Sequence, residues 1–383
     1  MVSAPQEPEH GTRSTDAAHM ENRKKLAWCL GALLVAPLVL EGAARLRSYL
    51  RYGSTYDVFD LYESVDATGL RVPIKGLRAT LAKTARIEID SRGFRNPELV
   101  QPKPAGTVRL AFLGASPVFC VEVGSNASTW PHLVREGLAS AHPGQRFDYI
   151  NAAVSAYSVA DSHVRLVQHV QPLDPDVVII YHATRDLSAD SFELAHEAGL
   201  ISPREPGFFE RHSFLVQQLL LNVRYWRAQR AGRSAAEAKL EVDPDTLARP
   251  FGHRLTALVA AARQTADCVV LVTFATRGRR DQSRALLLDN MAHAFTFTPY
   301  LSAESILDCY DAYNAEVRRA AHDGGALLLE AAPALPGTAE YFVDSVHLTE
   351  AGCRAMAKLI ADGLSAWPQF GSLLGVGEPR EGH

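Results

Sequence analysis

The chain has 383 residues, of which 47% are hydrophobic and 21% are charged. That length holds one large domain or two ordinary ones, and the composition is typical of a globular protein with a full apolar core. A formal net charge of −4 gives no basic surface for nucleic acid, so we expect no nucleic-acid partner. The five cysteines show no metal-binding spacing and are expected to be buried free thiols.

A polar leader and an apolar run open the chain. Residues 1–25 are polar and charged, and they are predicted to be disordered. Residues 26–40 carry no charge, and the apolar run continues past Glu41 to residue 44. A membrane-spanning helix needs about 17–25 mainly apolar residues. We therefore predict a single-pass transmembrane anchor over residues 26–44, with Glu41 at the headgroup level and the main domain outside the cytoplasm, in the periplasm.

Two features of this segment leave alternatives open. Basic residues flank the apolar run on both sides, so the positive-inside rule gives little guidance on orientation. Gly42, Ala43 and Ala44 offer the small residues of a signal-peptide cleavage site. The long polar leader favours an uncleaved signal anchor over a cleaved signal peptide.

Residues 45–106 are irregular and rich in proline and glycine. Residues 87–90 alternate between apolar and charged side chains like an edge strand, and residues 91–95 are typical of a turn. We interpret the whole stretch as a connector that packs on the main domain.

After residue 106, short apolar runs alternate with helical stretches. The runs predicted as buried strands are Val108–Leu113, Tyr149–Asn151, Val177–Tyr181, Val269–Val272 and Ala326–Leu329. The predicted helices are Trp130–Ala141, Val159–Val170, Leu255–Thr265, Ile306–Ala321 and Glu350–Ala366. This alternation predicts a three-layer α/β/α domain of flavodoxin-like type over residues 107–368, with a parallel sheet of about five strands. Residues 369–383 are expected to form a flexible tail.

Residues 187–245 interrupt the alternation as a helical insertion. Its apolar run at residues 215–223 leads into a series of arginines: Arg224, Arg227, Arg230 and Arg233. A basic amphipathic helix of this kind acts as a lid, rests on a membrane, or is an ordinary helix with a solvated cationic face.

Polar residues follow three of the predicted strands. Ser116 follows the first strand, residues 181–186 contain the end of the third, and Asp344 and His347 follow the last. Because right-handed crossovers bring the carboxyl ends of parallel strands to one edge, we expect these segments to converge there.

These side chains are of the kinds that nucleophilic catalysis needs. A serine hydroxyl is a weak nucleophile unless a base takes its proton, and an imidazole oriented by a carboxylate is the natural base. Ser116 is therefore the candidate nucleophile, His347 the candidate base and Asp344 its partner. Pro117 favours a helix start beside Ser116, and Thr349 is typical of an N-cap that would hold the loop of His347 in place.

The order of the motifs resembles the SGNH/GDSL hydrolase family rather than the G-x-S-x-G hydrolases. The first block of that family is similar to residues 114–116, the second to residues 151–158, the third to residues 181–187 and the last to residues 344–347. The likeness covers roughly residues 91–367, and the single N-terminal apolar segment is similar to that of membrane-anchored bacterial members. The resemblance implies a serine hydrolase with no metal and no organic cofactor.

The resemblance also implies an oxyanion hole, and here the chain departs from the family. The family uses the N–H of the nucleophile, a glycine N–H from the second block and an asparagine side chain from the third. Those positions are Ser116, Ala156 and Arg185. Alanine keeps the N–H, so this change is slight unless the site needs a positive φ. Arg185 replaces a compact neutral donor with a charged fork.

Three functions remain open at this point. The first is a serine esterase that removes ester-linked acyl groups outside the cytoplasm, with an ester or an acylated carbohydrate as substrate. The second passes the acyl group to a polysaccharide hydroxyl instead of water. The third is a non-catalytic carbohydrate-binding or scaffold protein on a degenerate hydrolase fold. The sequence predicts neither the acyl length nor the oligomeric state.

Overall fold

A five-stranded parallel sheet forms the centre of the protein, seen in a computed structural model that describes residues 12–52, 61–64, 69–81, 85–201, 205–233 and 240–375. The strands lie in the order β6-β5-β7-β8-β9. Their bounds are β5 (Thr107–Gly114), β6 (Arg146–Asn151), β7 (Val177–Tyr181), β8 (Cys268–Val272) and β9 (Leu327–Leu329). All residues of β7 and β8 are buried, as expected for strands covered on both faces. The predicted parallel sheet is confirmed.

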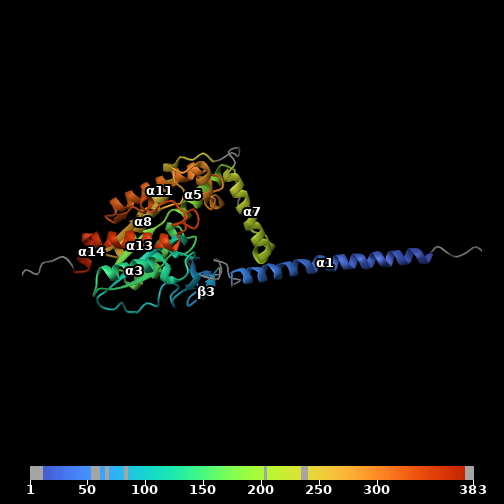
Figure 1. The fold of residues 1–383 in the computed structure, drawn as a ribbon, viewed down its shortest axis with the longest axis horizontal. Coiled ribbons are helices and arrows are strands. Elements are labelled where there is room, and N and C mark those ends of the chain that lie inside the picture. The colour runs from blue at the N-terminus through green and yellow to red at the C-terminus, as the bar shows by residue number, and fades with distance from the viewer. Residues whose placement is uncertain are drawn as a thin grey trace, which may run out of the picture.

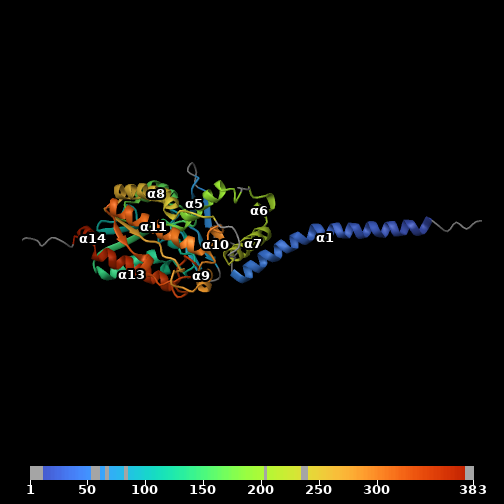
Figure 2. The same ribbon diagram turned by 90° about the horizontal axis from the view of Figure 1, so that it is seen from above.

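Helices cover both faces of this sheet (Figures 1 and 2). One face carries α3 (Trp130–Ala141) and α13 (Glu350–Ala366), which pack on each other. The other face carries α4 (Val159–Arg165), α8 (Pro244–Thr265) and α11 (Ala303–Asp323). The shorter helices are α2 (Ser116–Phe119), the π-helical turn η3 (Leu166–Val170), α9 (Arg284–Asn290), α10 (Ala294–Phe297) and α12 (Ala331–Ala334).

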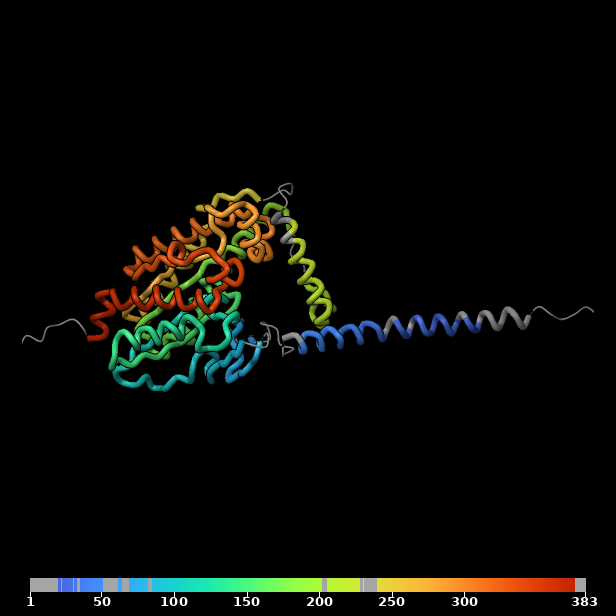
Figure 3. The backbone as a smooth tube through the Cα atoms, viewed as in Figure 1, coloured from blue at the N-terminus to red at the C-terminus, as the bar shows by residue number. Residues whose placement is uncertain are grey.

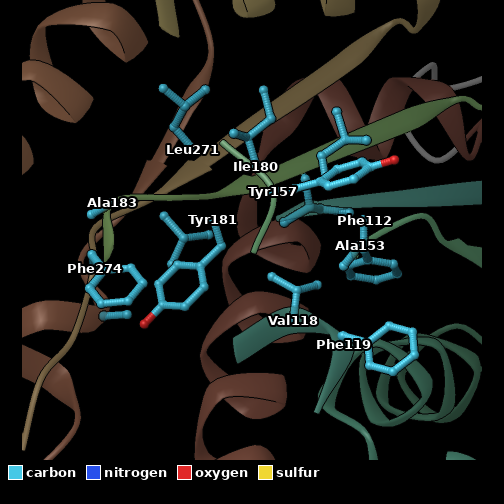
Figure 4. Packing of buried hydrophobic residues seen from close by; sticks show 14 of the residues in the cluster. Phe112, Val118, Phe119, Ala153, Tyr157, Ile180, Tyr181, Ala183, Leu271 and Phe274 are labelled. Atoms are coloured by element: carbon cyan, nitrogen blue, oxygen red, sulfur yellow. The ribbon is translucent and has the colours of Figure 1, made fainter. Parts of the chain in front are cut away.

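Aromatic side chains join the sheet to these helices. Tyr181, the last residue of β7, stacks on Phe274 with ring centroids 4.7 Å apart (Figure 4). Phe112 of β5 meets Trp130 edge to face at 5.2 Å. The Trp130 indole N–H donates to the Pro117 carbonyl at 2.9 Å, so the large ring is buried without an unpaired donor. This packing holds the carboxyl ends of β5 and β7 together.

The strand order reverses between β5 and β7. The chain runs from β5 outward to β6 and then returns across β5 to β7. The helices after β5 and β7 therefore lie on opposite faces, which leaves a crevice above the carboxyl ends of these two strands. Ligand sites of open parallel sheets lie at this kind of position.

Two small antiparallel sheets occupy the stretch predicted as a connector. They pair β1 (Tyr62–Ser64) with β2 (Arg71–Pro73), and β3 (Arg78–Leu81) with β4 (Ala85–Glu88). Tyr62 reaches the second motif block, where its hydroxyl donates to Ser155 Oγ at 2.8 Å. The division of the chain into domains remains a prediction.

The stretch predicted as an insertion contains most of α5 (Thr184–Glu197), which packs on α8 within the body, and then α6 (Phe208–His212) and α7 (Phe214–Arg233). Helix α7 projects from the body as an arm (Figure 3). The arm leans on the long helix α1 (Thr12–Tyr52).

One carboxylate joins the arm to α1. Glu41 accepts hydrogen bonds from Ser213 Oγ at 2.8 Å and from the N–H groups of Phe214 and Leu215 at 2.9 Å. These N–H groups begin α7, so Glu41 caps a helix distant in sequence. The hydrogen bond from Leu215 is the main reason that the pKa of Glu41 falls to about 2.

In the part of the chain that the structure describes, no helix is long and apolar enough to cross a membrane. The transmembrane anchor predicted over residues 26–44 therefore finds no support. Glu41, predicted to lie at the headgroup level, accepts hydrogen bonds from the start of α7.

Both predicted tails are partly ordered. Residues from Thr12 onward belong to α1, where Glu21 and Lys25 form an ion pair of 2.7 Å one turn apart. At the other end, α14 (Pro368–Leu373) buries Phe370 against Phe147, with centroids 6.4 Å apart. Burial of Phe370 explains why this segment is held, contrary to the prediction for residues 369–375. Residues 1–11 and 376–383 lie outside the described part of the chain.

Replacement of Glu41 tests its role as a cap. Glu41→Ala removes the acceptor of the three donors at the start of α7, together with the partner of Arg45, and is expected to destabilise the first turn of α7 by about 1 kcal/mol. Hydrogen exchange should then accelerate several-fold at the amides of Phe214 and Leu215. The matched control is Glu21→Ala, which removes an exposed ion pair from the same helix. Unchanged protection of α7 in Glu41→Ala would contradict the role.

Candidate active site

Ser116 stands directly above the carboxyl end of β5. It is the first residue of α2, and Pro117 occupies the following position, where its missing N–H costs nothing. Gly114 makes this turn sterically feasible. A Cβ at Gly114 would lie 2.7 Å from the Tyr181 carbonyl oxygen and would also clash with Val118. The glycine of the first block is therefore required by close packing between β5 and β7.

The loop of His347 is a small closed turn. Phe342 and Leu348 form an antiparallel bridge, and the Val343 N–H donates to the His347 carbonyl at 2.8 Å. Asp344 Oδ1 accepts the N–H groups of Val346 and His347, both at 2.9 Å. The loop therefore curls far enough for the Asp344 carboxylate to meet the ring of His347.

Thr349 ends this loop and begins α13. Its hydroxyl accepts the N–H of Gly352 at 3.1 Å, which confirms the predicted N-cap. The cap fixes the direction in which α13 leaves the site.

Ser116, His347 and Asp344 form one hydrogen-bonded chain. His347 Nε2 lies 2.8 Å from Ser116 Oγ, and His347 Nδ1 lies 2.7 Å from Asp344 Oδ2. Burial acts to raise the pKa of Asp344, but the hydrogen bond and charge of His347 outweigh it and hold that pKa well below its usual range. The structure thus brings together the three predicted side chains from opposite ends of the domain.

Glu122 is a fourth ionisable group at this centre, and sequence reasoning missed it. Its Oε1 lies 3.8 Å from His347 Nε2. Burial acts to lower the pKa of His347, but the charge of Glu122 and the hydrogen bond and charge of Asp344 outweigh it and raise the pKa to about 9. Burial also raises the pKa of Glu122 itself. No motif marks Glu122, which follows Ser116 by six residues in an irregular loop.

His293 is a second residue that sequence reasoning missed. It precedes α10, and its Nδ1 lies 3.6 Å from Asp344 Oδ2. Its ring meets that of His347 edge to face, with centroids 5.4 Å apart. Burial lowers the pKa of His293, which favours a neutral imidazole.

His293, Asp344 and His347 also form a group able to hold a metal ion. Their ligand atoms lie within 4.8 Å of one another. A metal on His347 Nδ1 would have to replace the hydrogen bond of 2.7 Å to Asp344. In the arrangement seen here, that nitrogen serves the hydrogen-bonded chain.

The two unusual positions of the predicted oxyanion hole lie side by side. Ala156 has φ +69°, in the left-handed region that favours glycine. The family's glycine position therefore does need a positive φ, and alanine bears a strain of roughly 1–2 kcal/mol there. Arg185 is exposed on the first turn of α5, and its Nε–H donates to the Ala156 carbonyl at 3.2 Å.

A second serine–histidine pair lies nearby but is sealed inside the protein. His182 Nε2 is 2.8 Å from Ser162 Oγ, and both residues are buried. Burial lowers the pKa of His182 to about 3, so its ring is neutral. Asp186 anchors the same region by accepting the Val159 N–H at 3.1 Å. These contacts fix the turn that carries Arg185.

Comparison with known protein families identifies the chain. The family model described as the GDSL-like lipase/acylhydrolase family matches residues 112–355, which is more than half of the sequence. The chain belongs to this family. The SGNH/GDSL resemblance seen in the sequence is thereby confirmed.

Solved structures give a weaker likeness. LAE5, an alpha/beta hydrolase enzyme from the metagenome of Lake Arreo, Spain, has 16% identity and a TM-score of 0.42, over 71% of this chain and 97% of that one. Axe2, an acetylxylan esterase from Geobacillus stearothermophilus, has 16% identity and a TM-score of 0.41, over 67% and 93% respectively. Likeness at this level says nothing of a shared activity. No curated protein matches the chain.

The strain at Ala156 predicts an unusual stabilisation. Ala156→Gly relieves the left-handed strain and loses less than that in unfolded-state entropy, so it should stabilise the fold by about 0.5–1 kcal/mol. The control is Ala153→Gly, at a buried position of the same loop without a positive φ, which should destabilise by about 1 kcal/mol. Urea unfolding measures both. Equal destabilisation by the two changes would contradict the strain.

The charge of Glu122 predicts the titration of His347. Glu122→Gln should lower the pKa of His347 by roughly one unit, because it removes a nearby opposite charge. NMR of the imidazole protons measures this, with Glu136→Gln on the surface of α3 as control. An unchanged titration in Glu122→Gln would refute the coupling.

The raised pKa of His347 also stabilises the folded protein. That contribution is complete below about pH 6.5 and is lost as pH rises through about 9.

Proposed function

We propose that this protein is a serine esterase that hydrolyses ester-linked acyl groups. The observation that carries the proposal is the continuous hydrogen-bonded chain from Ser116 through His347 to Asp344. A binding protein on a degenerate fold has no need to keep these three groups in contact. Membership of the GDSL-like lipase/acylhydrolase family supports the same chemistry.

Each member of the chain has a role that its geometry supports. Ser116 Oγ attacks the ester carbonyl carbon while His347 Nε2 takes its proton, and the protonated imidazole then donates to the departing alcohol. Water, deprotonated by the same nitrogen, releases the acyl group from Ser116. Asp344 holds Nδ1 protonated and stabilises the imidazolium that forms.

The surrounding charges decide at which pH this base works. A pKa of about 9 leaves His347 mostly protonated at neutral pH. Only the neutral imidazole accepts the serine proton, so the rate in the free enzyme should rise with pH up to that value. Glu122 thus sets an alkaline working range by stabilising the imidazolium.

The oxyanion of the tetrahedral intermediate forms beside three donors in this proposal. They are the N–H groups of Ser116 and Ala156 and the side chain of Arg185. The Arg185 Nε–H is directed to the Ala156 carbonyl, and this contact orients its guanidinium along the second block. Its remaining N–H groups carry a permanent charge, which suits a developing oxyanion.

We also propose that the domain acts outside the cytoplasm on an acylated carbohydrate. Exposed apolar side chains on α1 support a location beside a membrane: Trp28 is 81% exposed and Leu38 is 73% exposed. Protease treatment of intact spheroplasts tests the compartment. Digestion of the main domain supports the proposal, and full protection until lysis contradicts it.

Loss of the nucleophile gives the direct test of hydrolysis. The full-length protein should release acetate from aryl acetates and acetylated oligosaccharides. Ser116→Ala and His347→Ala should lower kcat by at least about 10³, since these residues act as one unit. Ser372→Ala is the control, because this serine lies on α14, which follows the end of α13 that is distant from the site. Equal activity of Ser116→Ala and wild type would refute the proposal.

The same assay separates hydrolysis from transfer. With an unacylated oligosaccharide present, an esterase still releases free acetate from the donor. Acetylated oligosaccharide in preference to free acetate would identify a polysaccharide O-acyltransferase instead.

Arg185 is tested by two replacements. Arg185→Met keeps the length without the donors and should lower kcat by about 10²–10³ with little change in KM. Arg185→Asn installs the family's donor and should remain within about tenfold of wild type. If the methionine variant keeps full kcat, Arg185 is no oxyanion donor.

A further inference from the structure

Two buried cysteines from distant parts of the chain lie side by side next to the active site. The Sγ atoms of Cys120 and Cys353 are 4.0 Å apart, across 233 positions of sequence. Cys120 is 2% exposed and Cys353 is fully buried, and both are free thiols here. Cys268 and Cys309 are buried as well, on β8 and α11.

The pair joins the two halves of the active site. Cys120 ends α2, whose first residue is Ser116, and it has a left-handed φ of 60°. Cys353 lies in the first turn of α13, where its N–H donates to the Thr349 carbonyl at 2.8 Å. Ser116 and His347 thus lie four positions before Cys120 and six before Cys353, respectively.

Other contacts already hold these two segments in register. The Gly124 N–H donates to Glu350 Oε1 at 3.2 Å, which ties the loop after α2 to the start of α13. Arg95 Nη1 donates to the carbonyls of Phe119 and Cys120 at 2.7 and 2.6 Å. The backbone around the two thiols is therefore fixed from several sides, and their meeting is a property of the folded domain.

We propose that Cys120 and Cys353 form an intramolecular disulfide that cross-links the nucleophile segment to the helix following the catalytic histidine. A disulfide needs an S–S distance of about 2.05 Å. The sulfurs, 4.0 Å apart, must therefore approach each other by roughly 2 Å. Besides its contact with Cys353, the Cys120 thiol lies 3.3 Å from the carbonyl oxygens of Pro117 and Val118, and such weak S–H bonds oppose the rotation little.

The chemistry is thiol–disulfide exchange with a small disulfide such as oxidised glutathione. One cysteine loses its proton and attacks the oxidant, which gives a mixed disulfide and releases one glutathione thiol. The second cysteine, also as thiolate, displaces the other glutathione. The protein loses two electrons and two protons, and both go to two molecules of reduced glutathione. Burial raises the pKa of Cys120, so the exchange is faster during folding than in the closed native state.

The cross-link should stabilise the domain without blocking the site. It closes a very long loop, which restricts the unfolded chain most strongly. Oxidised protein should therefore melt several degrees above reduced protein. Ser116 and His347 are already in hydrogen-bond contact, so ester hydrolysis should persist after oxidation.

Thiol counting after refolding tests the proposal. Full-length protein carrying Cys29→Ser, which removes the exposed thiol, is refolded in reduced or oxidised glutathione buffer. Thiols are then titrated in denaturant, and peptides are mapped without reduction. The four remaining thiols should fall to two in oxidising buffer, with Cys120 and Cys353 on one linked peptide.

Matched variants make the result decisive. Adding Cys353→Ala should leave three thiols in both buffers and abolish the shift in Tm. Adding Cys268→Ala and Cys309→Ala should leave the cross-link and the shift intact. Four free thiols in folded protein across all oxidising buffers, or a linked peptide that contains Cys268 or Cys309, would overturn the proposal.

Discussion

The hydrogen bond between Ser116 and His347 joins residues separated by 231 positions, and the site depends on it. It exists because β5 is an internal strand of the sheet, next to β7, and the strand order reverses between these two strands. Close packing of β5 on β7 then requires a glycine at position 114, where a Cβ would meet the Tyr181 carbonyl. The fold thus presents Ser116 in a crevice, and the turn closed by Asp344 delivers the imidazole to it.

Negatively charged side chains lie near both nitrogens of the His347 ring. Glu122 faces one ring nitrogen and Asp344 the other, so the protonated ring is stabilised from both sides. Burial lowers the pKa of His293, and its Nδ1 lies 3.6 Å from the same carboxylate. The raised pKa of His347 stabilises the imidazolium that forms during the reaction, but it leaves a smaller fraction of the histidine neutral and able to act as base at neutral pH.

Much of this architecture could be predicted from the sequence, because buried parallel strands are continuous apolar runs. The bounds of β7, α3 and α13 agree with the predicted ones to the residue. Ser116, Asp344 and His347 could be found because each follows a predicted strand, and the carboxyl ends of parallel strands lie at one edge of the sheet. Glu122 and His293 could not, since irregular loops bring them in and no periodicity marks a loop.

The less predictable features depend on tertiary contacts. The positive φ of Ala156 could not be predicted, because glycine is the residue that indicates a left-handed backbone and this position holds alanine. The sequence predicted Glu41 at a membrane surface. Its hydrogen bonds to the N–H groups at the start of α7 could not be predicted, because α7 is distant in sequence. Phe370 was predicted to belong to a flexible tail, because the sequence does not indicate that its ring stacks on Phe147.

The most direct measurement of the central claim is covalent labelling of the full-length protein with a fluorophosphonate, followed by peptide mapping. Such probes react with serine hydroxyls that a base has activated. We expect a single adduct on Ser116, formed faster as pH rises toward 9 and absent when His347 is replaced by alanine. A folded protein that takes no label, or takes it on another serine, would contradict an activated Ser116.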